Sequence, residues 1–173
     1  MLNWAKAHRA VAVAALVLIG SGVYWFAPQR LFLDREVAES LPTLPANVSA
    51  SPGGEEASTP IRVRELSSGE FQSLEHATSG RARIVELENG SRFVRLQDLD
   101  TSDGPDLRVY LTDQPVSEDW GVWDDGRYVD LGELKGNLGD SNYRIPGDVD
   151  LSGFRTVVIW CRRFTVAFGV APV

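Results

Sequence analysis

Residues Arg81–Leu99 read RARIVELENGSRFVRLQDL, two runs of strand-forming residues joined by Asn89-Gly90. An Asn-Gly pair readily takes the positive φ angles of a two-residue hairpin turn. Val, Ile and Phe on the two sides of the pair favour extended backbone. This stretch therefore predicts a β-hairpin, and with it a sheet-based domain.

Further short strands are expected after the hairpin, because turn residues recur at short intervals and no long stretch shows helical periodicity. The expected strands are Leu107–Thr112, Tyr128–Leu131, Asn142–Pro146, Phe154–Cys161 and Phe164–Phe168. LGELKGNLGD, with Gly132, Gly136 and Gly139, is expected to form a long loop. The pattern predicts an all-β domain, built as an antiparallel sandwich or barrel.

The segment TVVIWC near the C-terminus is the most apolar part of the expected domain. Val157, Ile159 and Cys161 share one strand face, and Val158 and Trp160 share the other. Apolar residues on both faces predict a central strand that is buried from two sides. Cys161 ends that strand.

Ala10–Ala27 is a run of 18 residues without a formal charge. As a helix it would extend ~27 Å, close to the thickness of a bilayer core. Lys6 and Arg9 precede the run, which favours a cytoplasmic N-terminus and an extracytoplasmic C-terminal domain. We therefore expect a single-pass transmembrane helix in the cell membrane, and a cleaved signal peptide is the alternative.

The chain divides into three expected parts. Residues 1–30 form the cytoplasmic tip and anchor, and residues 61–173 form the extracytoplasmic β domain. Between them, Leu31–Leu41 is expected to form a short membrane-proximal helix, and Thr43–Pro60 a flexible linker rich in Pro, Ser and Gly.

The charge of the chain excludes one class of partner. Residues 31–173 carry 14 basic and 24 acidic residues, a net charge of −10. Nucleic-acid binding requires a basic surface, so we expect no nucleic-acid partner. The expected partners are therefore the membrane, in which the chain is anchored, and a cell-surface protein or redox partner.

Several motifs occur in an order that resembles the DM-thirteen family, an electron-transfer domain. The matching pieces are Gly69–Phe71, His76–Ile84 (HATSGRARI), Gly104–Leu111 (GPDLRVYL), Leu131–Pro146 and Phe154–Ala171 (FRTVVIWCRRFTVAFGVA). The resemblance covers about residues 62–173. It implies a β-sandwich similar to DOMON-type domains and a redox role for Cys161, either as a bare thiol or as the ligand of a prosthetic group such as haem.

Cys161 is the sole cysteine, so it can form no internal disulfide. A redox or ligand role needs the thiolate, which Arg162 or Arg163 could favour if either guanidinium reached the sulfur. The alternative is a small buried hydrophobe that closes a core strand.

His76 is the only histidine in the expected outer domain, and it could act as a metal or haem ligand or as a base near Cys161. The alternative is a histidine that hydrogen-bonds the backbone at a strand end, just before a turn at Ser79-Gly80.

Two loops offer other chemistry. Asp98, Asp100, Asp103 and Asp106 lie in DLDTSDGPD, whose spacing departs from the EF-hand pattern, so we expect no metal site there. Trp120, Trp123 and Trp160 are expected to be core or edge-packing rings. The alternative is that Trp120 and Trp123, which lie in the acidic loop SEDWGVWDDG, are partly exposed and form a contact surface. No hydrolase motif is present in the sequence.

Two functions follow from these residues. The first is a membrane-anchored extracytoplasmic redox accessory that transfers electrons through Cys161. The second is a non-enzymatic binding or scaffold module that acts through Trp120–Tyr128 or Asp98–Asp106. A stand-alone enzyme is the less favoured interpretation.

Overall fold

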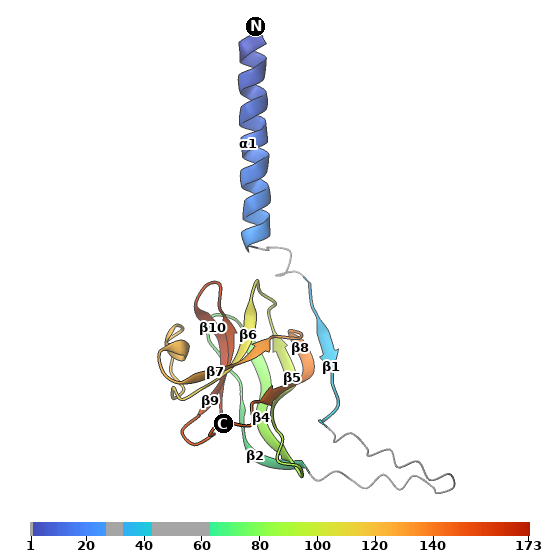
Figure 1. Cartoon of the computed structure of the whole chain (residues 1–173), viewed down its shortest axis with the longest axis vertical. Helices are drawn as coiled ribbons and strands as arrows, with labels where there is room; N and C mark the ends of the chain where they lie inside the picture. Colours follow the sequence, from blue (N-terminus) through green and yellow to red (C-terminus); the bar gives the residue numbers. More distant parts are fainter. Residues whose placement is uncertain (1, 27–32, 43–62) are drawn as a thin grey trace, which may run out of the picture.

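The computed structural model describes residues 2–26, 33–42 and 63–173 (Figure 1). The described elements are α1 (Leu2–Phe26), β1 (Glu36–Ala38), β2 (Val63–Glu70), β3 (Gln72–Ser73), β4 (Thr78–Leu87), β5 (Arg92–Thr101), β6 (Leu107–Thr112), the 3-10 turn η2 (Val122–Asp124), β7 (Tyr128–Glu133), β8 (Leu138–Ile145), β9 (Thr156–Cys161) and β10 (Val166–Pro172). The described chain is therefore mostly β, as the sequence predicted.

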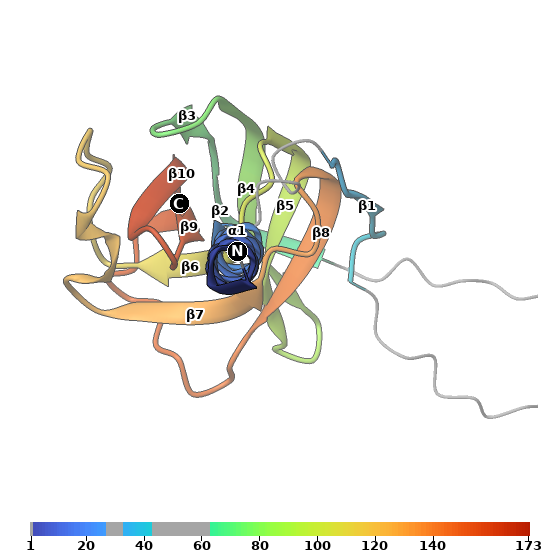
Figure 2. The ribbon, with the colours of Figure 1, turned by 90° about the horizontal axis from the view of Figure 1, so that it is seen from above.

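Two five-stranded sheets form a sandwich-like fold (Figure 2). The first sheet has the order β1-β8-β5-β4-β2, and the second has the order β3-β10-β9-β6-β7. All pairs are antiparallel except β1 with β8. The hairpin predicted around Asn89-Gly90 is confirmed as β4 and β5, and Gly90 has a φ of 78° as such a turn requires.

The main hydrophobic core lies between the two sheets. It combines Ala82 and Ile84 of β4, Val94 and Leu96 of β5 and the inward residues of β6, β9 and β10. All six residues of β9 are buried, which confirms the central strand with two buried faces. Val158 and Trp160 of β9 pack in a smaller cluster on the outer face of the second sheet.

We call this smaller cluster the outer aromatic cluster. It consists of Tyr110, Trp123, Val158, Trp160, Ala167 and Val170, with Leu74 and Val122 packed against it. Trp123 and Trp160 are fully buried, as expected of core rings, so Trp123 does not contribute to a contact surface. Trp120 in the same loop is 49% exposed, as the alternative of a contact surface requires.

The helix predicted over Leu31–Leu41 is wrong in its described part, because Glu36–Ala38 forms β1 and pairs in parallel with β8. Arg35 explains this conformation. Its guanidinium donates from Nε and Nη2 to the Asp103 carboxylate at 3.1 and 2.9 Å, and its backbone N–H donates to Asn137 Oδ1 at 2.7 Å. The extended backbone lets these polar groups reach buried partners. The predicted linker Thr43–Pro60 lies outside the described residues.

Two further boundaries differ from the prediction. β8 begins at Leu138, so the predicted loop over LGELKGNLGD is shorter than expected. Gly139 lies within this strand at a φ of 90°, and a side chain there would meet the Val37 carbonyl oxygen at 2.3 Å. Gly139 was expected to lie in a loop, but it permits the close approach of β1 to β8 because it has no side chain.

Helix α1 covers the apolar run, and its described apolar side chains, such as Leu16 and Leu18, are exposed. No helix in the described part of the chain reaches the combined length and apolarity of a membrane span. The transmembrane part of the fold prediction is therefore not supported by the structure, and it stays a prediction.

Candidate functional site

Cys161 ends β9 in the middle of the second sheet, with Leu107 of β6 and Val166 of β10 as its neighbours across the strands. Its side chain is fully buried and belongs to the core between the sheets. The exposed β9–β10 turn, residues 162–165, follows it directly. The thiol is thus a core group that lies one residue from solvent-exposed backbone.

Burial is the main reason that the pKa of the Cys161 thiol is raised, and the negative charge of Asp106 adds to it. Hydrogen bonds from the backbone N–H groups of Phe164 and Arg163, together with the Arg163 charge, favour the thiolate but do not outweigh burial. Arg162 donates from Nε to Asp106 Oδ2 at 2.9 Å. The thiol is therefore protonated at neutral pH, which is the form least reactive toward soluble electrophiles.

His76 lies against Phe168 of β10, with the two ring centroids 3.9 Å apart. Its backbone N–H donates to the Phe168 carbonyl oxygen at 3.4 Å. Phe168 belongs to the same core cluster as Cys161, so the structure relates His76 to the thiol only through this shared neighbour. The turn predicted after His76 is wrong, because Ser79 and Gly80 lie inside β4.

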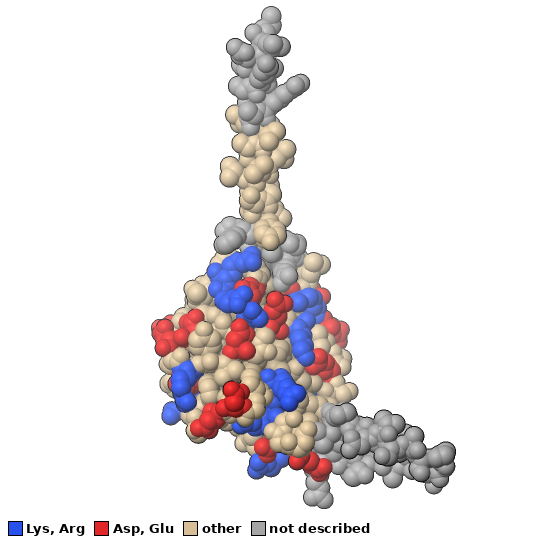
Figure 3. All heavy atoms as spheres, in the orientation of Figure 1, with Lys and Arg blue, Asp and Glu red and all other residues tan. Residues whose placement is uncertain are grey.

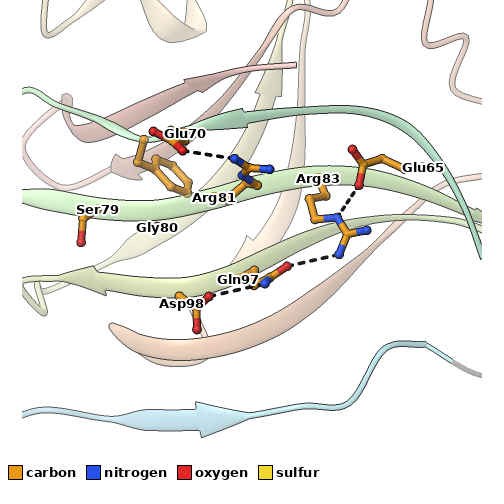
Figure 4. Close-up of a pocket in the computed structure, with 9 residues that line it drawn as sticks. Glu65, Glu70, Ser79, Gly80, Arg81, Arg83, Gln97 and Asp98 are labelled. Carbon is orange, nitrogen blue, oxygen red and sulfur yellow. Dashed lines mark hydrogen bonds and ion pairs between the residues drawn. The ribbon is translucent and has the colours of Figure 1, made fainter.

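A pocket of about 610 Å³ opens on the outer face of the first sheet (Figure 4). Its lining comes from β2, β4, β5 and the residue after β2: Glu65, Glu70, Phe71, Ser79, Gly80, Arg81, Arg83, Gln97 and Asp98. Sequence reasoning missed this pocket. Neither Cys161 nor His76 lines it.

Backbone irregularities shape the pocket. The pairing of β4 with β5 shifts register between Ser79 and Arg81, beside Asp98, which has a φ of 50°. Gly80 has a φ of 106°, and a side chain there would meet the Asp98 carbonyl oxygen at 2.5 Å. Bulges often re-aim side chains next to functional sites. The Ser-Gly pair inside a strand-like run was the one signal in the sequence.

Both arginines in the pocket are already paired with a glutamate. Arg83 donates from Nε to Glu65 at 2.6 Å and from Nη1 to Gln97 Oε1 at 3.2 Å, and Arg81 contacts Glu70 at 3.1 Å (Figure 4). Such a surface suits a polar ligand that both donates and accepts hydrogen bonds. It lacks the apolar walls that a large planar cofactor needs.

Comparison with known proteins places these features in a family. The family model described as "Electron transfer DM13" matches residues 70–173, which include the strands around Cys161 and His76. The chain belongs to the electron-transfer DM13 family. No curated protein and no solved structure matches the chain.

A haem, which the earlier resemblance implied, does not fit the DM13 domain at Cys161. The sulfur lies in a packed core between Leu107 and Val166, with Phe168 in the same cluster. Iron could reach the thiol only if these side chains moved apart. His76 packs against Phe168, with the two rings tilted by 38°, and lies outside the pocket described above. The ligand role assigned to His76 therefore stays a prediction.

The aspartates of the DM13 domain engage separate partners. Asp103 is buried and pairs with Arg35, whereas Asp106 pairs with Arg162 and Arg108. Within the described residues, no three His, Cys, Asp or Glu side chains gather as a metal site would require. The aspartates instead serve to hold β1 and the β9–β10 turn.

Proposed function

We propose that this DM13 chain transfers electrons on the outer side of a membrane and that Cys161 is its redox group. The family supports electron transfer, and Cys161 is the only thiol of the chain. The observation that carries the proposal is the placement of this thiol. It is buried at the end of the central strand, and two backbone N–H groups of the exposed β9–β10 turn hydrogen-bond its sulfur.

This placement favours one-electron chemistry over thiol–disulfide exchange. Exchange requires an exposed thiolate that can attack a disulfide sulfur, and here the thiol is buried with a raised pKa. In the proposed cycle the thiol loses one electron to a one-electron acceptor on a partner, and its proton passes to solvent at the β9–β10 turn. A one-electron donor and solvent later return both. Burial also protects the oxidised sulfur from further oxidation.

The N-terminal helix supports the location. Its described apolar residues are exposed, and Lys6 and Arg9 precede the apolar run. We place the β domain outside the cell membrane on this basis. On the face of the domain shown in Figure 3, basic and acidic side chains are interspersed, which fits a protein partner better than nucleic acid.

Anaerobic coulometry with small soluble mediators tests the redox role. The full-length protein is oxidised and reduced, and the electrons exchanged per chain are counted for the wild type, Cys161→Ala and Cys161→Ser. Trp120→Phe, at an exposed ring outside the core, serves as the matched control. We expect reversible exchange in the wild type and the control and one electron fewer per chain in the two Cys161 variants. Equal exchange in all four proteins would refute the role of Cys161.

A binding module is the second candidate, because the polar pocket on the first sheet and the exposed Trp120 both face solvent. It predicts that Trp120→Ala or Arg81→Ala abolishes capture of a cell-surface protein while Cys161→Ala retains it. Loss of capture in Cys161→Ala at unchanged stability would count against it.

A further inference from the structure

Three aromatic rings lead from the strand that carries Cys161 to the surface. Trp160 is fully buried, Tyr110 is 3% exposed and Tyr128 is 45% exposed. The ring centroids of Trp160 and Tyr110 are 6.1 Å apart, and those of Tyr110 and Tyr128 are 4.8 Å apart in a stacked pair. The three rings lie on β9, β6 and β7, neighbouring strands of the second sheet. Electrons can pass between aromatic rings at such separations.

Trp160 Nε1 is buried and has no hydrogen-bond partner among the described residues. Such an orphaned donor carries a free-energy cost and calls for an explanation. Trp123, in the same cluster, shows the ordinary arrangement, because its Nε1 donates to the Asp119 carbonyl oxygen at 3.0 Å. An indole becomes acidic when it loses an electron. With no acceptor at Nε1, Trp160 would keep its proton and exchange the electron alone.

Tyr110 is suited to lie between Trp160 and the surface. Burial raises its pKa to about 12, and the nearby Asp130 acts in the same direction. The phenol therefore keeps its proton at neutral pH. Its ring can couple Trp160 to Tyr128 without itself losing a proton.

We propose that Trp160 is a buried one-electron site that exchanges electrons with a partner at Tyr128 through the ring of Tyr110. The partner is a protein with a metal centre that changes its charge by one. That centre gains one electron, and Trp160 loses one to become an indole radical cation with its proton in place.

This inference rests on the proposed function in one respect, because Cys161 is the group that returns an electron to oxidised Trp160. Cys161 follows Trp160 directly in the chain, although the two side chains point to opposite faces of β9. Trp160 recovers its electron from the thiol, which becomes a thiyl radical as its proton passes to solvent at the β9–β10 turn. The sequence of steps gives a fully buried thiol an electronic path to the surface.

Flash photolysis of the full-length protein tests the path. Photo-oxidised ruthenium tris-bipyridine serves as the one-electron oxidant, in a background in which Trp4, Trp25 and Trp120 are Phe. Transient absorption distinguishes a protonated indole radical cation from a neutral indole radical. We expect the radical cation in this background and its loss in Trp160→Phe. Tyr128→Leu should slow its formation by an order of magnitude or more, whereas Phe164→Leu, at an exposed ring in the β9–β10 turn, should not.

The outcomes separate this inference from the proposed function. A radical cation that lives longer in Cys161→Ala than in the parent supports both. Equal lifetimes, with the Tyr128 dependence intact, support the path and contradict the role of Cys161. No indole radical, a neutral radical that Trp160→Phe abolishes or a rate that Tyr128→Leu leaves unchanged overturns the path, even if coulometry shows a redox-active Cys161.

Discussion

Single residues set the chemistry of the domain through burial. Cys161 and Trp160 are adjacent and both fully buried, yet they belong to different clusters on opposite faces of β9. Alternation along a strand places the thiol in the core between the sheets and the indole in the outer aromatic cluster. Trp160 and Cys161, two adjacent oxidisable residues, therefore lie in two separate environments.

The thiol makes the stability of the domain depend on alkaline pH. Burial raises the pKa of Cys161, so the folded state keeps a proton that the unfolded state loses above about 8.5, the pKa of an ordinary thiol. Stability should therefore fall as pH rises through this range, by at most about 1.4 kcal/mol per pH unit for one proton.

Urea unfolding at neutral and alkaline pH measures this loss, with Cys161→Ala as the reference that lacks the thiol. Tyr110, whose raised pKa acts in the same direction, is present in both proteins and cancels in the comparison. The wild type should lose more stability than the variant. An identical loss in the two proteins would contradict a raised thiol pKa.

At the scale of elements, β1 shows how a short segment is held by side chains rather than by its length. Only three residues pair with β8, but Arg35 reaches the buried Asp103, and Glu39 contacts Lys135 at 2.7 Å. The hydrogen bonds from Lys135 and Asn142 outweigh the effect of burial and lower the pKa of Glu39. Protonation of Glu39 at acid pH should therefore weaken the attachment of β1.

Arg35→Ala should destabilise the domain by about 1–3 kcal/mol, because it leaves the Asp103 carboxylate buried without its cation. Arg64→Ala is the matched control. Its partner Glu86 and Arg64 itself are more exposed, so the loss should be about 0–1 kcal/mol. Thermal or urea unfolding gives both values. If Arg35→Ala loses no more unfolding free energy than the control, β1 is not anchored through Asp103.

The sequence predicted the elements whose signals are local. Asn89-Gly90 specified the β4–β5 hairpin, and the strand expected over Leu107–Thr112 coincides with β6. β1 was missed because its conformation depends on Asp103 and Asn137, which lie 68 and 102 residues from Arg35 in the chain. The end of β9 could be predicted from the apolar pattern, which is local. The pocket could not, because it depends on a register shift in the pairing of β4 with β5.

At the scale of the whole molecule, β1 changes the relation between the N-terminal helix and the domain. Residues 36–38 already belong to the first sheet, at the edge opposite β2. The expected linker Thr43–Pro60 therefore joins two strands of one sheet and does not separate the helix from the domain. Residues 27–35 alone connect α1 to β1, a reach of at most about 3.6 Å per residue.

The proposed location can be tested by cell fractionation. The full-length chain should remain with the membranes after an alkaline wash, whereas a chain that lacks residues 1–30 should be released. External protease should cut the domain in intact cells or spheroplasts if it lies on the outer side. Release of the full-length chain by the wash would contradict the anchor.

The most direct test of the central claim is a count of sulfur-centred radicals on Cys161 after oxidation. The full-length protein is treated anaerobically with a one-electron oxidant and freeze-quenched while folded, and the radicals are counted by electron paramagnetic resonance before and after reduction. The account predicts a signal that appears on oxidation, disappears on reduction and is absent from Cys161→Ala. A protein that consumes oxidant and gives no such signal, or the same signal in Cys161→Ala, would show that Cys161 is not the redox group.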